Sequence, residues 1–223
     1  MIQEILNNHE IILENTKHVF YSNCNNNTLF ISFAGKIEKY VSLTWFYNQF
    51  DILGNFLFLK NDEEGYNTYH EEKYYKLIQH YMDKLQVTNL ITFGPSMGGI
   101  ASIMFGLHFN ANSIISIDPC PINFDYRILL EKIQNYPNNY DYNNKIYLNY
   151  TFINNFDNNF ETLPESTQYI IEELKKKNFI FTVQPFHSFN HLAFIPSKEF
   201  LKDIIHFQSS LQVKNYLDSY KWF

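Results

Sequence analysis

A serine flanked by glycines is the part of this sequence whose residue types and spacing could do chemistry. Residues 94–98 read GPSMG, so Ser96 stands in the pattern Gly-x-Ser-x-Gly, and another glycine follows at position 99. A strand-like apolar run precedes the pattern and a helix-compatible apolar run follows it. In such a strand–turn–helix context the serine sits on a sharp elbow above a parallel sheet, and glycines allow the tight backbone and the close approach of the helix. The pattern predicts Ser96 as a nucleophile, against the alternative of an ordinary serine in a glycine-rich turn.

Two histidines near the C-terminal end are the candidates for a general base. A serine nucleophile needs a base within hydrogen-bond reach and an acid that orients the base. In the elbow-containing folds the chain order is serine, acid, histidine. His187 and His191 lie in PFHSFNHLAF, where we expect the loop after the last strand. We favour His191, which directly precedes the final apolar segment, and keep His187 as the alternative. The pair has no clear third partner, so we predict no metal site.

Two aspartates could supply the acid. Asp157 lies in FINNFDNNF, in the loop expected after the fifth strand, which is the usual position. Asp118 directly follows the strand after the nucleophile helix, although an Asp-Pro pair also commonly begins a turn. We expect Asp157 to be the acid, with Asp118 as the alternative.

Backbone N–H groups at two strand ends are the expected oxyanion hole. One donor is the N–H of Met97, the residue after the serine. The second must follow the first strand of the sheet, at Ala34 or Gly35. Neither donor depends on its side chain, so the sequence indicates the position of the hole and not the identity of its residues.

Short apolar runs alternate with segments of helical spacing along most of the chain. This alternation predicts an α/β fold: βαβ units that form a mostly parallel sheet, with helices on both faces. Residues 2–21 are expected to add an antiparallel edge hairpin. We expect one domain over residues 1–223, with 119–144 as a cap-like insertion over the site. The expected strands span residues 29–34, 55–60, 89–93, 113–117, 145–150 and 179–183, and the expected helices span 71–84, 97–109, 164–177 and 198–209.

Composition excludes several classes of function. With 17 basic and 23 acidic side chains the net charge is −6, and no basic face is visible, so we expect no nucleic-acid partner. No apolar run approaches the roughly 20 residues of a membrane span, and the N-terminal residues lack the pattern of a secretory signal. The two cysteines, Cys24 and Cys120, are far apart in sequence and suit a reducing cytosol. We therefore expect a cytoplasmic protein; the sequence does not indicate its oligomeric state.

About ninety residues of the chain resemble a known family. The segments FAG (33–35), NFLFLKND (55–62) and ITFGPSMGGIASIMFGLHFNANSIISIDP (91–119) look like a bacterial α/β-hydrolase-fold family of capsule and surface-polysaccharide loci. Some of its members resemble the acetyltransferase-like subunit of the accessory Sec secretion system. The match covers roughly residues 29–120 and is moderately specific. This chain has Ala34 where the family has serine, which removes a hydroxyl that could contact substrate.

The resemblance implies O-acetyl chemistry on sugars. It points to an O-acetyltransferase of a capsular or surface polysaccharide, or to a carbohydrate acetyl-esterase, with acetyl-CoA as a possible donor, no bound cofactor and a glycan as the acceptor. Both activities would share an acyl-enzyme on Ser96 and differ in whether a sugar hydroxyl or water attacks next. A third alternative is a pseudo-hydrolase that has kept the fold and serves as a subunit of a glycan or secretion assembly.

Overall fold

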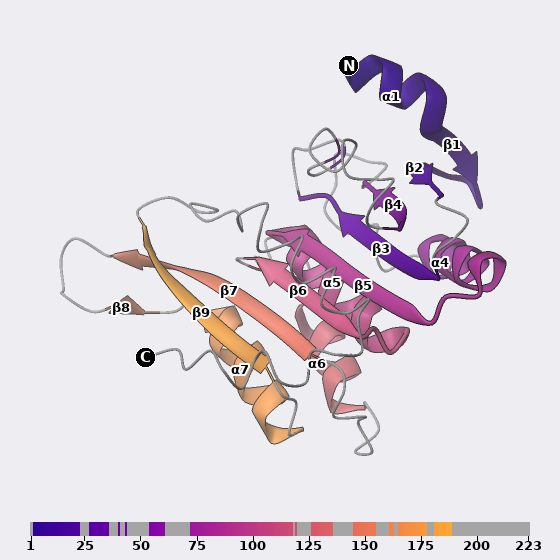
Figure 1. The fold of residues 1–223 in the computed structure, drawn as a ribbon. Coiled ribbons are helices and arrows are strands. Elements are labelled where there is room, and N and C mark those ends of the chain that lie inside the picture. Colours follow the sequence, from indigo (N-terminus) through magenta and orange to yellow (C-terminus); the bar gives the residue numbers. More distant parts are fainter. Residues whose placement is uncertain are drawn as a thin grey trace, which may run out of the picture.

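A nine-stranded mixed sheet forms the centre of the protein (Figure 1). In chain order its strands are β1 to β9, and all but β9 lie in the order β1-β2-β4-β3-β5-β6-β7-β8, while β9 pairs with β7. The computed structural model describes residues 2–22, 27–35, 40, 43, 54–60, 72–117, 119, 126–135, 145–154, 161–162, 165–177 and 181–188.

The N-terminal segment forms one edge of the sheet. Helix α1 (Ile2–His9) is followed by β1 (Glu10–Leu13) and β2 (Thr16–Tyr21), which form an antiparallel hairpin. The two residues between the strands, 14 and 15, have φ values of 52° and 55°. Positive φ at both positions is typical of the two-residue hairpin turns whose twist matches that of the flanking strands. The expected hairpin is therefore present, and a helix that we did not predict precedes it.

Six strands of the sheet run parallel. Next to β2 lie, in spatial order, β4 (Asn55–Leu59), β3 (Thr28–Phe33), β5 (Asn89–Pro95), β6 (Ser113–Ile117), β7 (Lys145–Asn154) and β9 (Phe181–Ser188). The two-residue β8 (Glu161–Thr162) pairs with β7 in the antiparallel sense. From β3 the chain crosses to β4 on one side and then to β5 on the other. In open α/β sheets, a reversal of this kind opens a crevice beyond the carboxyl ends of the strands.

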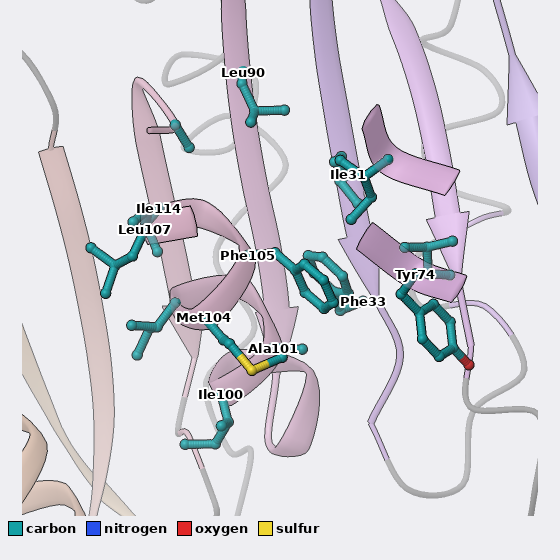
Figure 2. Packing of buried hydrophobic residues seen from close by; sticks show 14 of the residues in the cluster. Ile31, Phe33, Tyr74, Leu90, Ile100, Ala101, Met104, Phe105, Leu107 and Ile114 are labelled. Carbon is teal, nitrogen blue, oxygen red and sulfur yellow. The ribbon is translucent and has the colours of Figure 1, made fainter. Parts of the chain in front are cut away.

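Four helices contribute to the core on one face of the sheet. They are α4 (Glu72–Leu85), α5 (Met97–His108), α6 (Tyr126–Gln134) and α7 (Glu165–Lys176). In Figure 2 Phe105 of α5 lies against Phe33 of β3, and the two rings stack with their centroids 5.1 Å apart. Every residue of α5 except His108 is buried. A second apolar cluster lies on the opposite face, where Ile5 of α1 joins Phe30, Phe93 and Ile115.

The expected cap contains a crossover helix. Leu129 and Ile133 of α6 are fully buried in the same cluster as α5 and α7. These two positions are four apart and so share one face of a helix. Leu129 and Ile133 therefore attach α6 to the core. Apart from Pro119, α6 and residue 135, the rest of 119–144 lies outside the described residues, and the cap over the site stays a prediction.

Two strands are longer than the sequence indicated. β7 continues to Asn154, four residues past the expected end, and β9 runs to Ser188 through Pro185. The expected helix over 198–209 lies outside the described residues. Within the part of the chain that is described, no helix combines the length and hydropathy needed to cross a membrane.

Candidate active site

Ser96 occupies a strained turn between β5 and α5. Its φ of 53° and ψ of −122° fall outside the left-handed helical region, where ψ is positive. Such sparsely populated conformations cost about 1–3 kcal/mol and persist only where the surroundings enforce them. Ser96 is also largely buried, with 9% of its surface exposed. This is the elbow that the Gly-x-Ser-x-Gly pattern predicts.

Backbone hydrogen bonds hold the elbow on the neighbouring strand. The N–H of Ser96 donates to the carbonyl of Ile117, the last residue of β6, at 2.8 Å. The N–H of Gly99 donates to the carbonyl of Ser96 at 2.9 Å and closes the first turn of α5. The hydroxyl of Ser96 makes no capping hydrogen bond with α5. The turn is thus fixed through the main chain, and the serine hydroxyl is not used to stabilise the helix.

The glycines on either side of Ser96 allow the backbone to pack this closely. A Cβ on Gly94 would overlap the carbonyl of Gly98. A Cβ on Gly98 would overlap the carbonyl of Phe33 and lie 3.0 Å from the carbonyl oxygen of Ala34. A side chain at Gly94 would push α5 away from β5, and a side chain at Gly98 would push α5 away from the carboxyl end of β3.

The segment after β3 lies directly beside the serine. The register of β3 with β5 pairs Ser32 with Phe93, and three more residues along each strand bring Gly35 level with Ser96. A Cβ on Gly35 would lie 3.7 Å from the Cβ of Ser96. Because β3 and β5 flank the reversal in strand order, Ser96 and Gly35 meet at the crevice where α/β sheets bind their ligands.

The backbone geometry distinguishes between the expected oxyanion donors. The N–H of Ala34 donates to the carbonyl of Leu59 at 2.9 Å and so continues the ladder between β3 and β4. The N–H of Gly35, one residue further, remains the candidate on this side of the crevice. Met97 is the first residue of α5, and the first N–H groups of a helix have no acceptor within the helix. The N-terminal end of the helix also favours negative charge.

Hydroxyl groups behind the elbow meet at the carbonyl of Gly99, and the sequence analysis did not identify them. Ser102 donates to this carbonyl at 2.7 Å, and Ser116 of β6 donates to it at 3.0 Å. Thr92 of β5 donates in turn to the carbonyl of Ser102 at 2.9 Å. A small polar residue inside an apolar strand was the only sequence signal, and it does not reveal the partner.

The candidate base and acids lie on or beyond the following strands. His187 belongs to β9, where it pairs with Phe152. His191 comes three residues after the end of β9, and Asp157 three residues after the end of β7; both lie outside the described residues, as does Asp118. Asp118 directly follows Ile117, whose carbonyl accepts the Ser96 N–H. Asp118 thus follows in sequence the residue that accepts the N–H of the elbow, and the described residues give no side-chain contact for any of the four candidates.

The strand register gives the lateral distance between the elbow and β9. Pro95 pairs with Ile117, Ile117 with Asn149, and Asn149 with Gln184. Ser96 is therefore separated from β9 by three strand spacings, about 14 Å at the usual spacing of neighbouring strands. The backbone of β9 at this level therefore lies to the side of the elbow by about that distance.

Titratable groups away from the elbow serve the stability of the β1–β2 edge. Burial opposes the ionisation of Glu10, but hydrogen bonds from Lys17 at 2.8 Å and Tyr40 at 2.7 Å outweigh it and hold the pKa of Glu10 below its ordinary value. His18 is fully buried, and its Nε2 lies 2.7 Å from the Tyr81 hydroxyl. Burial raises the pKa of Tyr81 to about 12. In the described ranges there is no group of His, Cys, Asp or Glu that could hold a metal ion.

Solved structures share this architecture. The phospholipase/carboxylesterase from Dyadobacter fermentans superposes with a TM-score of 0.57 at 9% identity, over 91% of this chain and 100% of its own. Est1E from Butyrivibrio proteoclasticus superposes with a TM-score of 0.52 at 12% identity, over 88% of this chain and 94% of its own. The chain has an α/β-hydrolase fold. This confirms the fold expected from the sequence, and at these identities the likeness concerns the fold alone.

One further neighbour of the α/β-hydrolase fold is larger than this chain. The Glycosylation Associate Protein (Gap123) complex from Streptococcus agalactiae superposes with a TM-score of 0.58 at 14% identity, over 81% of this chain. The match spans only 42% of the Gap123 chain, so this chain covers about two fifths of its length. Neither a protein-family model nor a curated protein sequence matches the chain.

Proposed function

We propose that this protein is a serine-dependent acyltransferase that moves an acetyl group from an activated donor, such as acetyl-CoA, to a hydroxyl of a surface glycan. The observation that carries the proposal is the strained elbow at Ser96. A φ of 53° with a ψ of −122° is a conformation that a serine rarely adopts, and here it belongs to a serine at the carboxyl edge of the sheet beside Gly35. Strain of this kind is typical of functional sites.

The proposed reaction has two steps that share one acyl-enzyme. The Ser96 oxygen attacks the acetyl carbonyl while the histidine takes the hydroxyl proton, and the donor thiolate leaves with that proton. The hydroxyl of the sugar then attacks the acyl-serine and gives its proton to the histidine, which passes it to the departing Ser96 oxygen, so that Ser96 is released with a new sugar ester. The oxyanion that forms in each step would be stabilised by the N–H of Met97, at the N-terminal end of α5, and by the N–H of Gly35 after β3.

His191 is the base in this proposal. The strand register supports it, because an imidazole of His187, inside β9, starts about 14 Å to the side of the elbow. A serine and a histidine side chain together do not span that distance with a hydrogen bond of about 3 Å. A loop that begins after Ser188 can carry His191 back toward the serine.

Asp157 remains the first candidate for the acid. It comes three residues after the end of β7, the strand that pairs with β9, and His191 comes three residues after the end of β9. Asp118 is the second candidate, because Ile117 before it accepts the Ser96 N–H at 2.8 Å. Variants of the two aspartates separate them, since only loss of the orienting acid should lower the rate strongly.

A glycan acceptor has support from the sequence resemblance and from one neighbour, whose name describes it as glycosylation-associated. A carbohydrate acetyl-esterase would use the same acyl-enzyme with water in place of the sugar hydroxyl. A pseudo-hydrolase subunit would keep the fold without acylation, but it would have no need to preserve a strained serine.

The test is to follow the acetyl group. The protein is incubated with acetyl-CoA and fragments of surface glycans, and the products are separated and weighed by mass spectrometry. O-acetylated sugar that depends on Ser96 supports the transferase. Release of free acetate at the same rate with and without sugar indicates an esterase, and no loss of acetyl-CoA or of an aryl acetate indicates a protein without acyl chemistry.

A further inference from the structure

Two consecutive residues of β6 hold the elbow from one side. The carbonyl of Ile117 accepts the N–H of Ser96 at 2.8 Å, and the hydroxyl of Ser116 donates to the carbonyl of Gly99 at 3.0 Å. Gly99 in turn donates its N–H to the carbonyl of Ser96. The first turn of α5 is therefore fastened to β6 at both of its ends.

Ser116 and Gly99 are packed closely against each other. Ser116 is fully buried, and a Cβ on Gly99 would lie 2.8 Å from its hydroxyl oxygen. The absence of a side chain at Gly99 is what allows Ser116 to reach the carbonyl. The glycine after the Gly-x-Ser-x-Gly pattern thus has a specific partner on the next strand.

The hydroxyl of Ser102 does not replace that of Ser116. Ser102 also donates to the Gly99 carbonyl, at 2.7 Å, and its hydroxyl lies 3.2 Å from the carbonyl of Ile115 on β6. The bond from Ser102 to Gly99 stays within α5, and the contact with Ile115 holds the second turn of the helix. The bond from Ser116 joins the sheet directly to the first turn, at the Gly99 carbonyl. This fixed turn includes Met97, the proposed oxyanion donor, so a small rotation of the turn would move its N–H away from the developing charge.

We infer that Ser116 is a positioning residue for acyl transfer: its hydroxyl holds the first turn of α5 so that Ser96 and the Met97 N–H keep their reactive geometry. The inference rests on the proposed function of Ser96. It assigns no direct contact with the substrate to Ser116. It assigns an effect on the rate of acylation, because misplacement of reacting groups by about 1 Å can lower a rate by up to a hundredfold.

The test compares two serines of the same strand. Ser116→Ala removes the hydroxyl that donates to the carbonyl of Gly99. Ser113→Ala removes the same atom from a fully buried position of β6, where the hydroxyl has no hydrogen-bond partner. The burst of p-nitrophenol from p-nitrophenyl acetate gives the acylation rate constant and the half-saturating concentration for each variant. Thermal unfolding shows that both variants are folded at the assay temperature.

Ser116→Ala should lower the acylation rate constant about five- to tenfold, as expected for one lost hydrogen bond, with the half-saturating concentration changed less than about twofold. Ser113→Ala should change neither. Ser116→Cys replaces the hydroxyl with a larger thiol that is a weak donor, so it should lower the acylation rate at least as much as Ser116→Ala, and it also serves if the alanine variant does not fold.

An acylation rate of Ser116→Cys or Ser116→Ala equal to that of the wild type would overturn the inference while the acyl-enzyme stands. An equal loss in Ser113→Ala would overturn it as well, because the effect would then be one of stability. If the wild type releases no p-nitrophenol and forms no adduct on Ser96, the proposed function and this inference both fall.

Discussion

The strain at Ser96 predicts an unusual order of stability for two inactive variants. Ser96→Ala removes the hydroxyl but keeps a Cβ in the conformation with φ 53° and ψ −122°. Ser96→Gly removes the Cβ, and glycine adopts positive φ without steric cost. Relief of about 1–3 kcal/mol is offset by about 0.5–1 kcal/mol for the greater freedom of glycine in the unfolded chain. Ser96→Gly should therefore be more stable than Ser96→Ala by about 1 kcal/mol.

Ser113 provides the matched control, because it is also a buried serine, but it lies in the extended strand β6. There the order should be the ordinary one, with Ser113→Gly less stable than Ser113→Ala by about 0.5–1 kcal/mol. Free energies of unfolding come from urea titrations followed by circular dichroism, with equal slopes required for the comparison. The reasoning is refuted if glycine is the less stable choice at position 96 as it is at 113.

Three more predictions concern the base and the β1–β2 edge. His191→Ala should lower the acylation rate by three or more orders of magnitude, and His187→Ala by less than tenfold. The reverse order would show that the base is His187, on β9. Tyr81→Phe should reduce the free energy of unfolding by about 1–3 kcal/mol, because it leaves Nε2 of the buried His18 without its partner, and an unchanged value would contradict this. Since the pKa of Glu10 is lowered in the folded state, its contribution to stability is present above its unfolded pKa and is lost as the pH falls through the folded pKa. The wild type should accordingly lose more stability than Glu10→Gln between about pH 5 and pH 3, and parallel curves would show that the charge of Glu10 is not stabilising.

The elements that could be predicted are those specified by local residue chemistry. The elbow follows from glycines around a serine between an apolar strand and an apolar helix, and β5, α5 and β6 begin and end close to the expected residues. Helix α6 was missed because aromatic and Asn residues surround it, although Leu129 and Ile133 carry a helical spacing. The end of β7 was placed too early because the Asn-rich stretch at 154–159 made the whole segment after residue 150 resemble a loop.

The remaining parts of the site depend on contacts between distant segments. The elbow pattern predicts that the end of the first strand comes near Ser96, but the register that brings Gly35 level with Ser96 follows only from the parallel pairing of β3 with β5. The sequence also offered Ala34 and Gly35 equally as oxyanion donors, and the bond from Ala34 to Leu59, across to β4, distinguishes them. Ser116 could be identified only from its hydrogen bond to the carbonyl of Gly99 on α5.

The central claim is that the hydroxyl of Ser96 is a nucleophile, and covalent labelling tests it most directly. The folded protein is treated with a fluorophosphonate, and intact mass spectrometry followed by peptide mapping locates the adduct, with Ser96→Ala as the control. The account predicts one adduct per chain, on the peptide that contains Ser96, and none in the variant. A folded wild-type protein that stays unlabelled, or one that is labelled to the same extent in Ser96→Ala, would contradict it.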